Sequence, residues 1–250
     1  MAVSDTAARP RQVVRNPHSA LPNWLYPTFV VFVLTVFGLY TAWVVLFQPV
    51  SQYAPYLSPF ASPLIRIDRI PPGILVVWAP LIFRATCYYY RKAYFRSFFW
   101  HPRSCAVDEP HRGRYRGETA FPLVLNNLHR FTFYVIVVQV LFLIFDALVA
   151  FNFGGRVGVG VGTVLMVVNV LLLSGYTFGC HSFRHLAGGG LDCYSCSRTA
   201  RARFRLWKGV TVLNLKHDRW AWASLFSVWL TDVYIRLLMS GALHDFRWIS

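Results

Sequence analysis

The chain has 250 residues, of which 56% are hydrophobic, 17% are aromatic and only 14% are charged, whereas a soluble domain usually carries about 25% charged residues. Its apolar residues form blocks long enough to cross a bilayer, which requires about 20 residues. The composition therefore excludes a soluble globular protein and predicts an all-α membrane protein, a bundle of five transmembrane helices. The net charge of +15 would suggest nucleic acid in a soluble protein, but here the basic residues lie in loops, so no nucleic-acid partner is expected.

Five segments within residues 24–243 are predicted to span the membrane, at residues 24–47, 70–90, 129–153, 157–180 and 220–243. The first carries no charge and begins at Trp24, and tryptophan is enriched at membrane interfaces. Residues 1–23 are polar and lack the short apolar core and cleavage site of a signal peptide. We therefore expect them to form a cytoplasmic N-terminal segment, and residues 244–250 to form an outer tail.

Lysine and arginine are unevenly divided between the two sides of this bundle. Eighteen of the 25 lie in the N-terminal segment and in the loops 91–128 and 181–219, and four lie on the opposite side, at Arg66, Arg69, Arg156 and Arg247. Basic residues flank spans on the cytoplasmic face. The sequence thus predicts a multi-pass protein of the cell membrane, embedded in lipid, with its N-terminus in the cytoplasm and its C-terminus outside.

A pattern of metal-ligand residues follows the fourth span. His181 and His185 are spaced i,i+4, which places both imidazoles on one face of a helix. Three glycines at 188–190 can reverse the chain, and Cys193 and Cys196 then return towards the histidines. Two histidines and two cysteines that meet in this way form a four-ligand metal or iron–sulfur site.

Three interpretations of this pattern stay open. The side chains are unliganded, or they hold a structural zinc ion, for which CxxC with HxxxH is a familiar spacing, or they bind a [2Fe–2S] cluster with the two-Cys, two-His ligand set of Rieske centres. The usual Rieske spacing, CxH with CxxH, is absent, so the motif alone does not favour iron. Cys180, beside His181, could replace one ligand, and a disulfide framework is not expected on the cytoplasmic side.

The positions of the eight histidines restrict haem binding. Seven lie in the N-terminal segment, in cytoplasmic loops or at cytoplasmic helix ends, and His244 lies in the outer tail. A b-type haem in a helical bundle needs two facing axial ligands. A haem in the outer half is therefore excluded, whereas one cytoplasmic-side haem remains open, for instance between His129 and His181.

Charged residues inside the predicted spans mark candidate functional positions. Asp232 and Arg236 are spaced i,i+4 in the fifth span and can neutralise each other, whereas Arg84 needs a polar partner on another helix. Aromatic side chains and a histidine occur at the level of Arg84, near the cytoplasmic side. We expect four residues to surround a quinone headgroup, with either of the first two donating to a carbonyl: Arg84, Tyr88, His129 and Trp220. An aromatic belt with a buried ion pair is the alternative.

The run FRATCYYYRKAYFRSFFWHPRSCAV at residues 83–107, the basic loop that follows it and the five spans entered from the cytoplasm resemble one known family. They are similar to the membrane-anchor subunits of actinobacterial succinate dehydrogenases, of the single-chain, five-helix cytochrome b type. The resemblance implies an anchor that passes electrons to menaquinone or ubiquinone in the respiratory chain. It also implies a cytoplasmic iron–sulfur subunit and a flavoprotein subunit docked on the basic loops, and no residue of this chain that is catalytic for succinate oxidation.

One departure from the family has a consequence for the cofactor. Di-haem relatives place axial histidines on several helices in both membrane halves, but spans one and two contain no histidine here. The resemblance then favours a Rieske-like [2Fe–2S] cluster as the electron relay, on the ligands His181, His185, Cys193 and Cys196. The alternatives are the same anchor with one cytoplasmic-side haem b, or a non-redox membrane scaffold or transporter with a structural zinc site.

Overall fold

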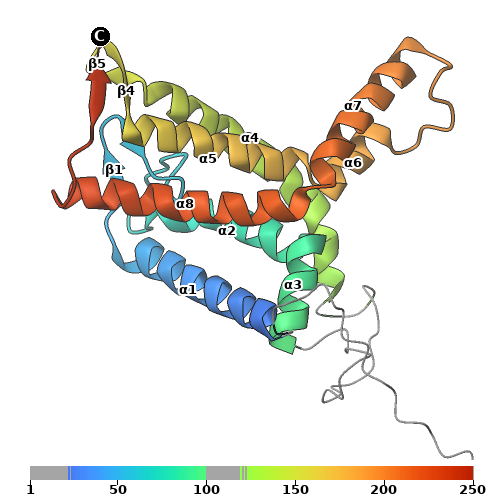
Figure 1. Ribbon diagram of the computed structural model, residues 1–250, viewed down its shortest axis with the longest axis horizontal. Coiled ribbons are helices and arrows are strands. Elements are labelled where there is room, and N and C mark those ends of the chain that lie inside the picture. The colour runs from blue at the N-terminus through green and yellow to red at the C-terminus, as the bar shows by residue number, and fades with distance from the viewer. Residues whose placement is uncertain (1–21, 23, 100–118, 120, 122, 250) are drawn as a thin grey trace, which may run out of the picture.

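The computed structural model describes residues 22, 24–99, 119, 121 and 123–249, and these residues are mostly helical (Figure 1). The predicted N-terminal segment and the middle of the first basic loop lie outside the described residues. A 3-10 turn, η2 (Leu123–Leu128), precedes α4. The helices are α1 (Leu25–Phe47), α2 (Pro72–Thr86), α3 (Tyr88–Phe99), α4 (His129–Val149), α5 (Val161–Phe178), α6 (His181–Gly188), α7 (Arg198–Asn214) and α8 (His217–Met239).

The long helices run side by side and alternate in direction (Figure 1). Helix α5 packs against α4 and α8, α2 packs against α4, and α1 packs against α2 and α3. At one end of this bundle lie short strands, and at the other end α6 and α7 project as a helical hairpin (Figure 1). Close approach of α5 and α8 depends on Gly175, where an added Cβ would lie 2.7 Å from the Trp220 indole.

The described residues contain three helices that are long and apolar enough to cross a membrane: α1, α4 with η2 (Val124–Val149), and α5. A fourth span is formed if α2 and α3, which are bent by 75°, are counted together. Helix α8 has 23 residues, but it also contains Asp218, Arg219, Asp232 and Arg236, which lower its apolar character. The predicted membrane protein is confirmed, whereas the fifth span of the predicted bundle is not identified by length and composition.

The second predicted span, residues 70–90, ends earlier than expected. Helix α2 stops at Thr86, and Cys87 adopts an extended conformation (φ −61°, ψ 131°) before α3 begins at a new angle. The sequence of α3 gives the physical reason, because Arg91, Lys92 and Arg96 favour the membrane surface over its interior. The bend leaves the Cys87 side chain only 2% exposed.

The fourth predicted span, residues 157–180, begins later than expected, because its first residues form a strand. The strands are β1 (Gln52–Tyr53), β2 (Tyr56–Leu57), β3 (Asn152–Phe153), β4 (Arg156–Gly160) and β5 (Arg247–Ile249). The turn between β3 and β4 uses Gly154 (φ 67°) and Gly155 (φ 91°), a left-handed conformation that glycine adopts without steric cost. Strand β4 pairs with β3 and β5 in an antiparallel sheet. The third predicted span accordingly ends at Val149 and the fourth begins at Val161.

The loop between α1 and α2 folds back into the same end of the bundle. Tyr56 is fully buried there, and its hydroxyl donates to Asp245 at 2.6 Å. Burial alone would raise the pKa of Asp245, but hydrogen bonds, led by those from Tyr56 and Tyr234, outweigh it and hold this pKa below its usual value. Gly162 leaves room for Tyr56, because a Cβ at this position would lie 2.5 Å from the ring.

Asp232 is the centre of a second buried polar group in this half of the bundle. Its carboxylate is 0% exposed and accepts from Tyr40 Oη and Ser58 Oγ, both at 2.5 Å. Arg236 Nε donates to it at 2.8 Å, one helical turn away. The predicted mutual neutralisation of Asp232 and Arg236 is therefore confirmed. Asp146, in α4, accepts a hydrogen bond from Ser62 of the same loop.

Candidate functional site

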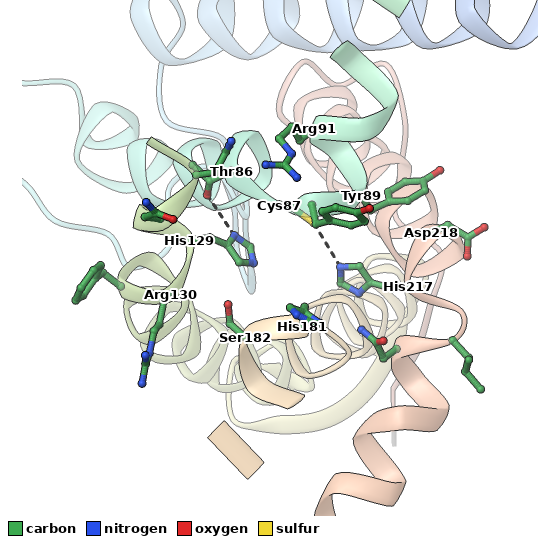
Figure 2. Close-up of a pocket in the computed structure, with 16 residues that line it drawn as sticks. Thr86, Cys87, Tyr89, Arg91, His129, Arg130, His181, Ser182, His217 and Asp218 are labelled. Carbon is green, nitrogen blue, oxygen red and sulfur yellow. Dashed lines mark hydrogen bonds between the residues drawn. The ribbon is translucent and has the colours of Figure 1, made fainter. Parts of the chain in front are cut away.

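A pocket of about 1000 Å³ opens at the opposite end of the bundle, and its lining residues come from the ends of α2, α3, η2, α4, α6, α7 and α8 (Figure 2). Its walls carry several side chains that can bind metals or donate hydrogen bonds. They include Cys87, Tyr88, Arg91, His129, His181 and His217.

His129 begins α4 and is held by the end of α2. Its Nδ1 lies 3.0 Å from the Phe83 carbonyl oxygen and 3.2 Å from Thr86 Oγ1. Its ring stacks on Phe83, with centroids 4.3 Å apart and planes within 9°. Because a carbonyl oxygen can only accept, Nδ1 is the protonated nitrogen and Nε2 keeps its lone pair. This is the arrangement that second-shell carbonyls impose on metal-binding histidines.

His217 begins α8 and faces Cys87 across the pocket. Its Nε2 lies 3.5 Å from Cys87 Sγ (Figure 2). Its ring stacks on Tyr176 of α5, with centroids 4.9 Å apart and planes within 15°. His217 Nδ1 is buried and has no hydrogen-bond partner among the described residues. Two aromatic rings, Phe83 and Tyr176, thus fix the two buried imidazoles.

Cys180 lies at the junction of α5 and α6, and its sulfur caps α6 by accepting from the Phe183 amide. It is 1% exposed and belongs to the same buried cluster as Cys87. Both cysteines are free thiols. Four helix ends therefore supply two buried thiols, Cys87 and Cys180, and two buried or largely buried imidazoles, His129 and His217. We call these four residues the inner set.

The sequence interpretation did not group the four residues of the inner set. It named His129 only for quinone or haem and Cys180 only as a substitute ligand, and it gave no ligand role to Cys87 or His217. Each of the four lies at a predicted cytoplasmic helix end, and that shared position is the signal that could have identified them.

The predicted set His181, His185, Cys193 and Cys196 is not assembled in this way. His181 and His185 do share one face of α6, with their Nε2 atoms 3.1 Å apart, as expected. Cys193 and Cys196 are joined to each other by a disulfide in the connection to α7, contrary to the expectation that no disulfide forms on this side, and in this bonded state neither sulfur is a free thiolate. Across residues 24–99 and 123–249, no three His, Cys, Asp or Glu side chains are close enough together to hold a metal ion.

His181 also lines the pocket, at the edge of the inner set. Burial lowers its pKa, and the nearby His185 and Arg184 lower it further. The His181 imidazole is therefore neutral at neutral pH.

The structure places two of the four residues predicted to surround a quinone in the pocket and the other two outside its lining. Tyr88 and His129 line the pocket, and Tyr88 is 65% exposed. Arg84 points elsewhere: its guanidinium donates to Tyr90 Oη at 2.5 Å, to the Ala221 carbonyl at 3.1 Å and to Ser224 Oγ at 2.9 Å. The predicted partner of Arg84 on another helix is thereby found on α8.

Trp220, the fourth residue of that set, packs against Gly175 instead of lining the pocket. The bend at Cys87 also separates Arg84 and Tyr88 onto two helices, so they do not share a helix face.

Known proteins resemble this chain over nearly its whole length. Residues 25–241 match the family described as actinobacterial succinate dehydrogenase subunit SdhC. A chain in the solved Mycobacterium smegmatis Sdh1 complex in the apo form is 35% identical, with 100% of both chains covered and a TM-score of 0.81. A search of curated proteins gave no match.

Proposed function

Because the chain belongs to the family of actinobacterial succinate dehydrogenase SdhC membrane subunits, we propose that it relays electrons to membrane quinone through a Rieske-type [2Fe–2S] cluster at the inner set. The family resemblance of the sequence is confirmed, and the chain is a subunit of a succinate dehydrogenase complex. The cluster, its ligands, the quinone position and the orientation in the membrane are our proposals.

The observation that carries the cluster is the convergence of two free buried thiols and two fixed imidazoles. In Rieske centres two cysteines hold one iron and two histidines hold the other, so Cys87 and Cys180 would hold the first and His129 and His217 the second. Buried polar atoms nearly always have hydrogen-bond partners. Yet three buried polar atoms in or beside the inner set have no hydrogen-bond partner within the described residues. They are His217 Nδ1, Tyr176 Oη and Trp220 Nε1. This concentration of unpaired polar atoms fits a polar group bound among them.

The donor types of the inner set, two thiols and two imidazoles, suit a [2Fe–2S] cluster of the Rieske type. Zinc can use the same donors, and membership of a succinate dehydrogenase complex, in which electrons are transferred, favours the redox-active cluster. When bound, the cluster supplies one-electron transfer at a potential raised by its imidazole ligands.

The protein groups around the inner set have positioning roles. The Phe83 carbonyl fixes the tautomer of His129, and the ring of Tyr176 fixes the plane of His217. The extended backbone at Cys87 turns its thiol inward from the end of α2. Burial of both cysteines limits the access of water to the sulfur atoms.

The quinone headgroup is proposed to bind at the open side of the pocket, beside Tyr88 and His129. Arg91, another lining residue, lies over the Tyr88 ring at 5.1 Å and adds positive charge there. The donors of Arg84 are engaged by Tyr90, Ala221 and Ser224. We therefore propose that Arg84 stabilises the packing of the helices beside the pocket and does not contact the headgroup. Trp220, which packs against Gly175, is proposed to have the same structural role.

Spectroscopy of the purified complex tests the cofactor directly. We expect a Rieske-type electron paramagnetic resonance signal after reduction, together with iron and acid-labile sulfide beyond what the partner subunits contain. His129 and His181 both line the pocket, so a single haem b between them is the second candidate. Haem absorption bands, or stoichiometric zinc with no such signal, would overturn the cluster.

Orientation is proposed from the distribution of charge. The pocket end carries α3 and the α6–α7 hairpin, and α7 contributes Arg198, Arg201, Arg203, Arg205 and Lys208. We propose that this end is cytoplasmic and docks the iron–sulfur subunit, with the flavoprotein subunit beyond it. A reporter enzyme fused after residue 250 should report an outer location, and one inserted within residues 91–116 a cytoplasmic location. Finding both on one side would refute the five-span topology.

A further inference from the structure

Tyr176 lies at the centre of the inner set without being one of the proposed ligands. Its ring stacks on His217 and makes an edge contact with Phe83, at 5.6 Å between centroids, and Phe83 itself stacks on His129. The guanidinium carbon of Arg84 lies 4.6 Å from the centroid of the Tyr176 ring. The Tyr176 ring therefore contacts the His217 imidazole directly and contacts the Phe83 ring that stacks on the His129 imidazole.

The hydroxyl of Tyr176 is the unexplained part of this arrangement. Tyr176 is 2% exposed, and no group in the described part of the chain forms a hydrogen bond with its hydroxyl. Leaving a buried hydroxyl unpaired is costly, so native structures rarely do it. Cys87, one of the two proposed thiolate ligands, belongs to the same buried cluster as Tyr176. The His217 ring, which stacks on Tyr176, also places its Nε2 3.5 Å from Cys87 Sγ.

We propose that the Tyr176 hydroxyl donates a hydrogen bond to the Cys87 thiolate of the bound cluster and thereby raises the reduction potential of that cluster. The inference rests on the proposed function. A neutral thiol is a weak acceptor, whereas a thiolate carries the negative charge that attracts a phenolic O–H. Hydrogen bonds to the sulfur atoms are among the factors that set iron–sulfur potentials.

The direction of the effect follows from charge. Reduction adds an electron to the cluster and increases the negative charge on its sulfur atoms, so a donor at Cys87 stabilises the reduced form more than the oxidised form. Arg84 strengthens this donor, because a cation over the ring face withdraws electron density from the phenol. Both groups therefore favour reduction of the cluster.

Replacing Tyr176 with phenylalanine removes the hydroxyl and keeps the ring. In the purified complex, the Tyr176→Phe variant should retain the cluster signal but show a lower midpoint potential in a redox titration followed by electron paramagnetic resonance. We expect the equilibrium to shift towards the oxidised form by about tenfold, which is 59 mV for a one-electron couple. Tyr134→Phe on α4, where the side chain is 50% exposed, is the matched control and should leave the potential unchanged.

A second substitution tests the same hydrogen bond from the opposite direction. Site-specific incorporation of 3-fluorotyrosine in place of Tyr176 makes the hydroxyl a stronger donor with little change in size, and should raise the potential. A cluster whose potential is unchanged in both variants would overturn the role of Tyr176. Absence of a cluster signal in the wild-type complex would instead overturn the proposed function, so the two failures are distinguishable.

Discussion

Replacing Cys87 or Cys180 with serine is expected to abolish the cluster signal and electron transfer to quinone, while succinate oxidation measured with an artificial dye continues. Both thiols are buried at the pocket end, and a serine hydroxyl does not replace a thiolate on ferric iron. The loss should exceed the about 10–100-fold that mutation of a second-shell partner costs. The dye accepts electrons from the partner subunits, so its reduction in the washed membrane fraction reports that these subunits remain attached to the membrane.

Cys193→Ser and Cys196→Ser are the matched controls, because these residues lie in the connection between α6 and α7 and are bonded to each other. We expect both variants to keep the signal and quinone reduction. The reverse result, with activity lost at Cys193 and Cys196 but kept at Cys87 and Cys180, would restore the ligand set predicted from local spacing. The four variants therefore decide between the two sets in one experiment.

The helices could be predicted from the sequence where apolar character alone determines them. Helix α1 and the start of α4 lie within a residue of the expected spans, because both segments are long and strongly apolar. The ends of α2 and the start of α5 could not be predicted from hydropathy. The bend at Cys87 depends on the polar surface of α3, and the strand before Val161 depends on pairing with β5, more than 80 residues later in the chain.

The candidate site shows the same limit at the level of side chains. A spacing such as HxxxH or CxxC is visible in one short stretch, and the local prediction for His181 and His185 was right about the shared helix face. The inner set contributes one residue from each of four helix ends, so no local spacing relates its members. Their convergence follows from the packing of α2, α4, α5 and α8 and becomes apparent only in three dimensions.

The second large effect is expected at the buried carboxylate of α8. Asp232→Ala leaves the Arg236 guanidinium, which is 17% exposed, without its ion-pair partner, and removes the acceptor of Tyr40 and Ser58. Breaking a buried ion pair from one side costs about 3–5 kcal/mol, because the remaining charge is uncompensated. The variant should therefore unfold at a clearly lower temperature when the detergent-purified complex is heated, and the loop that carries Ser58 should become sensitive to protease.

Two further variants separate the ion pair from general disruption. The double variant Asp232→Leu with Arg236→Met removes both charges and should recover much of the lost stability, since apolar replacement of a whole buried pair is often neutral. Asp68→Ala disrupts the pair of Asp68 with Arg69, whose side chains are 96% and 93% exposed, and should change the unfolding temperature little because exposed pairs contribute weakly. If the Asp232→Ala complex unfolds at the same temperature as the wild-type complex, the hydrogen bonds from Tyr40, Ser58 and Arg236 do not stabilise this half of the bundle. A double variant as unstable as Asp232→Ala would assign the loss to the unpaired hydroxyls of Tyr40 and Ser58 instead of the charge on Arg236.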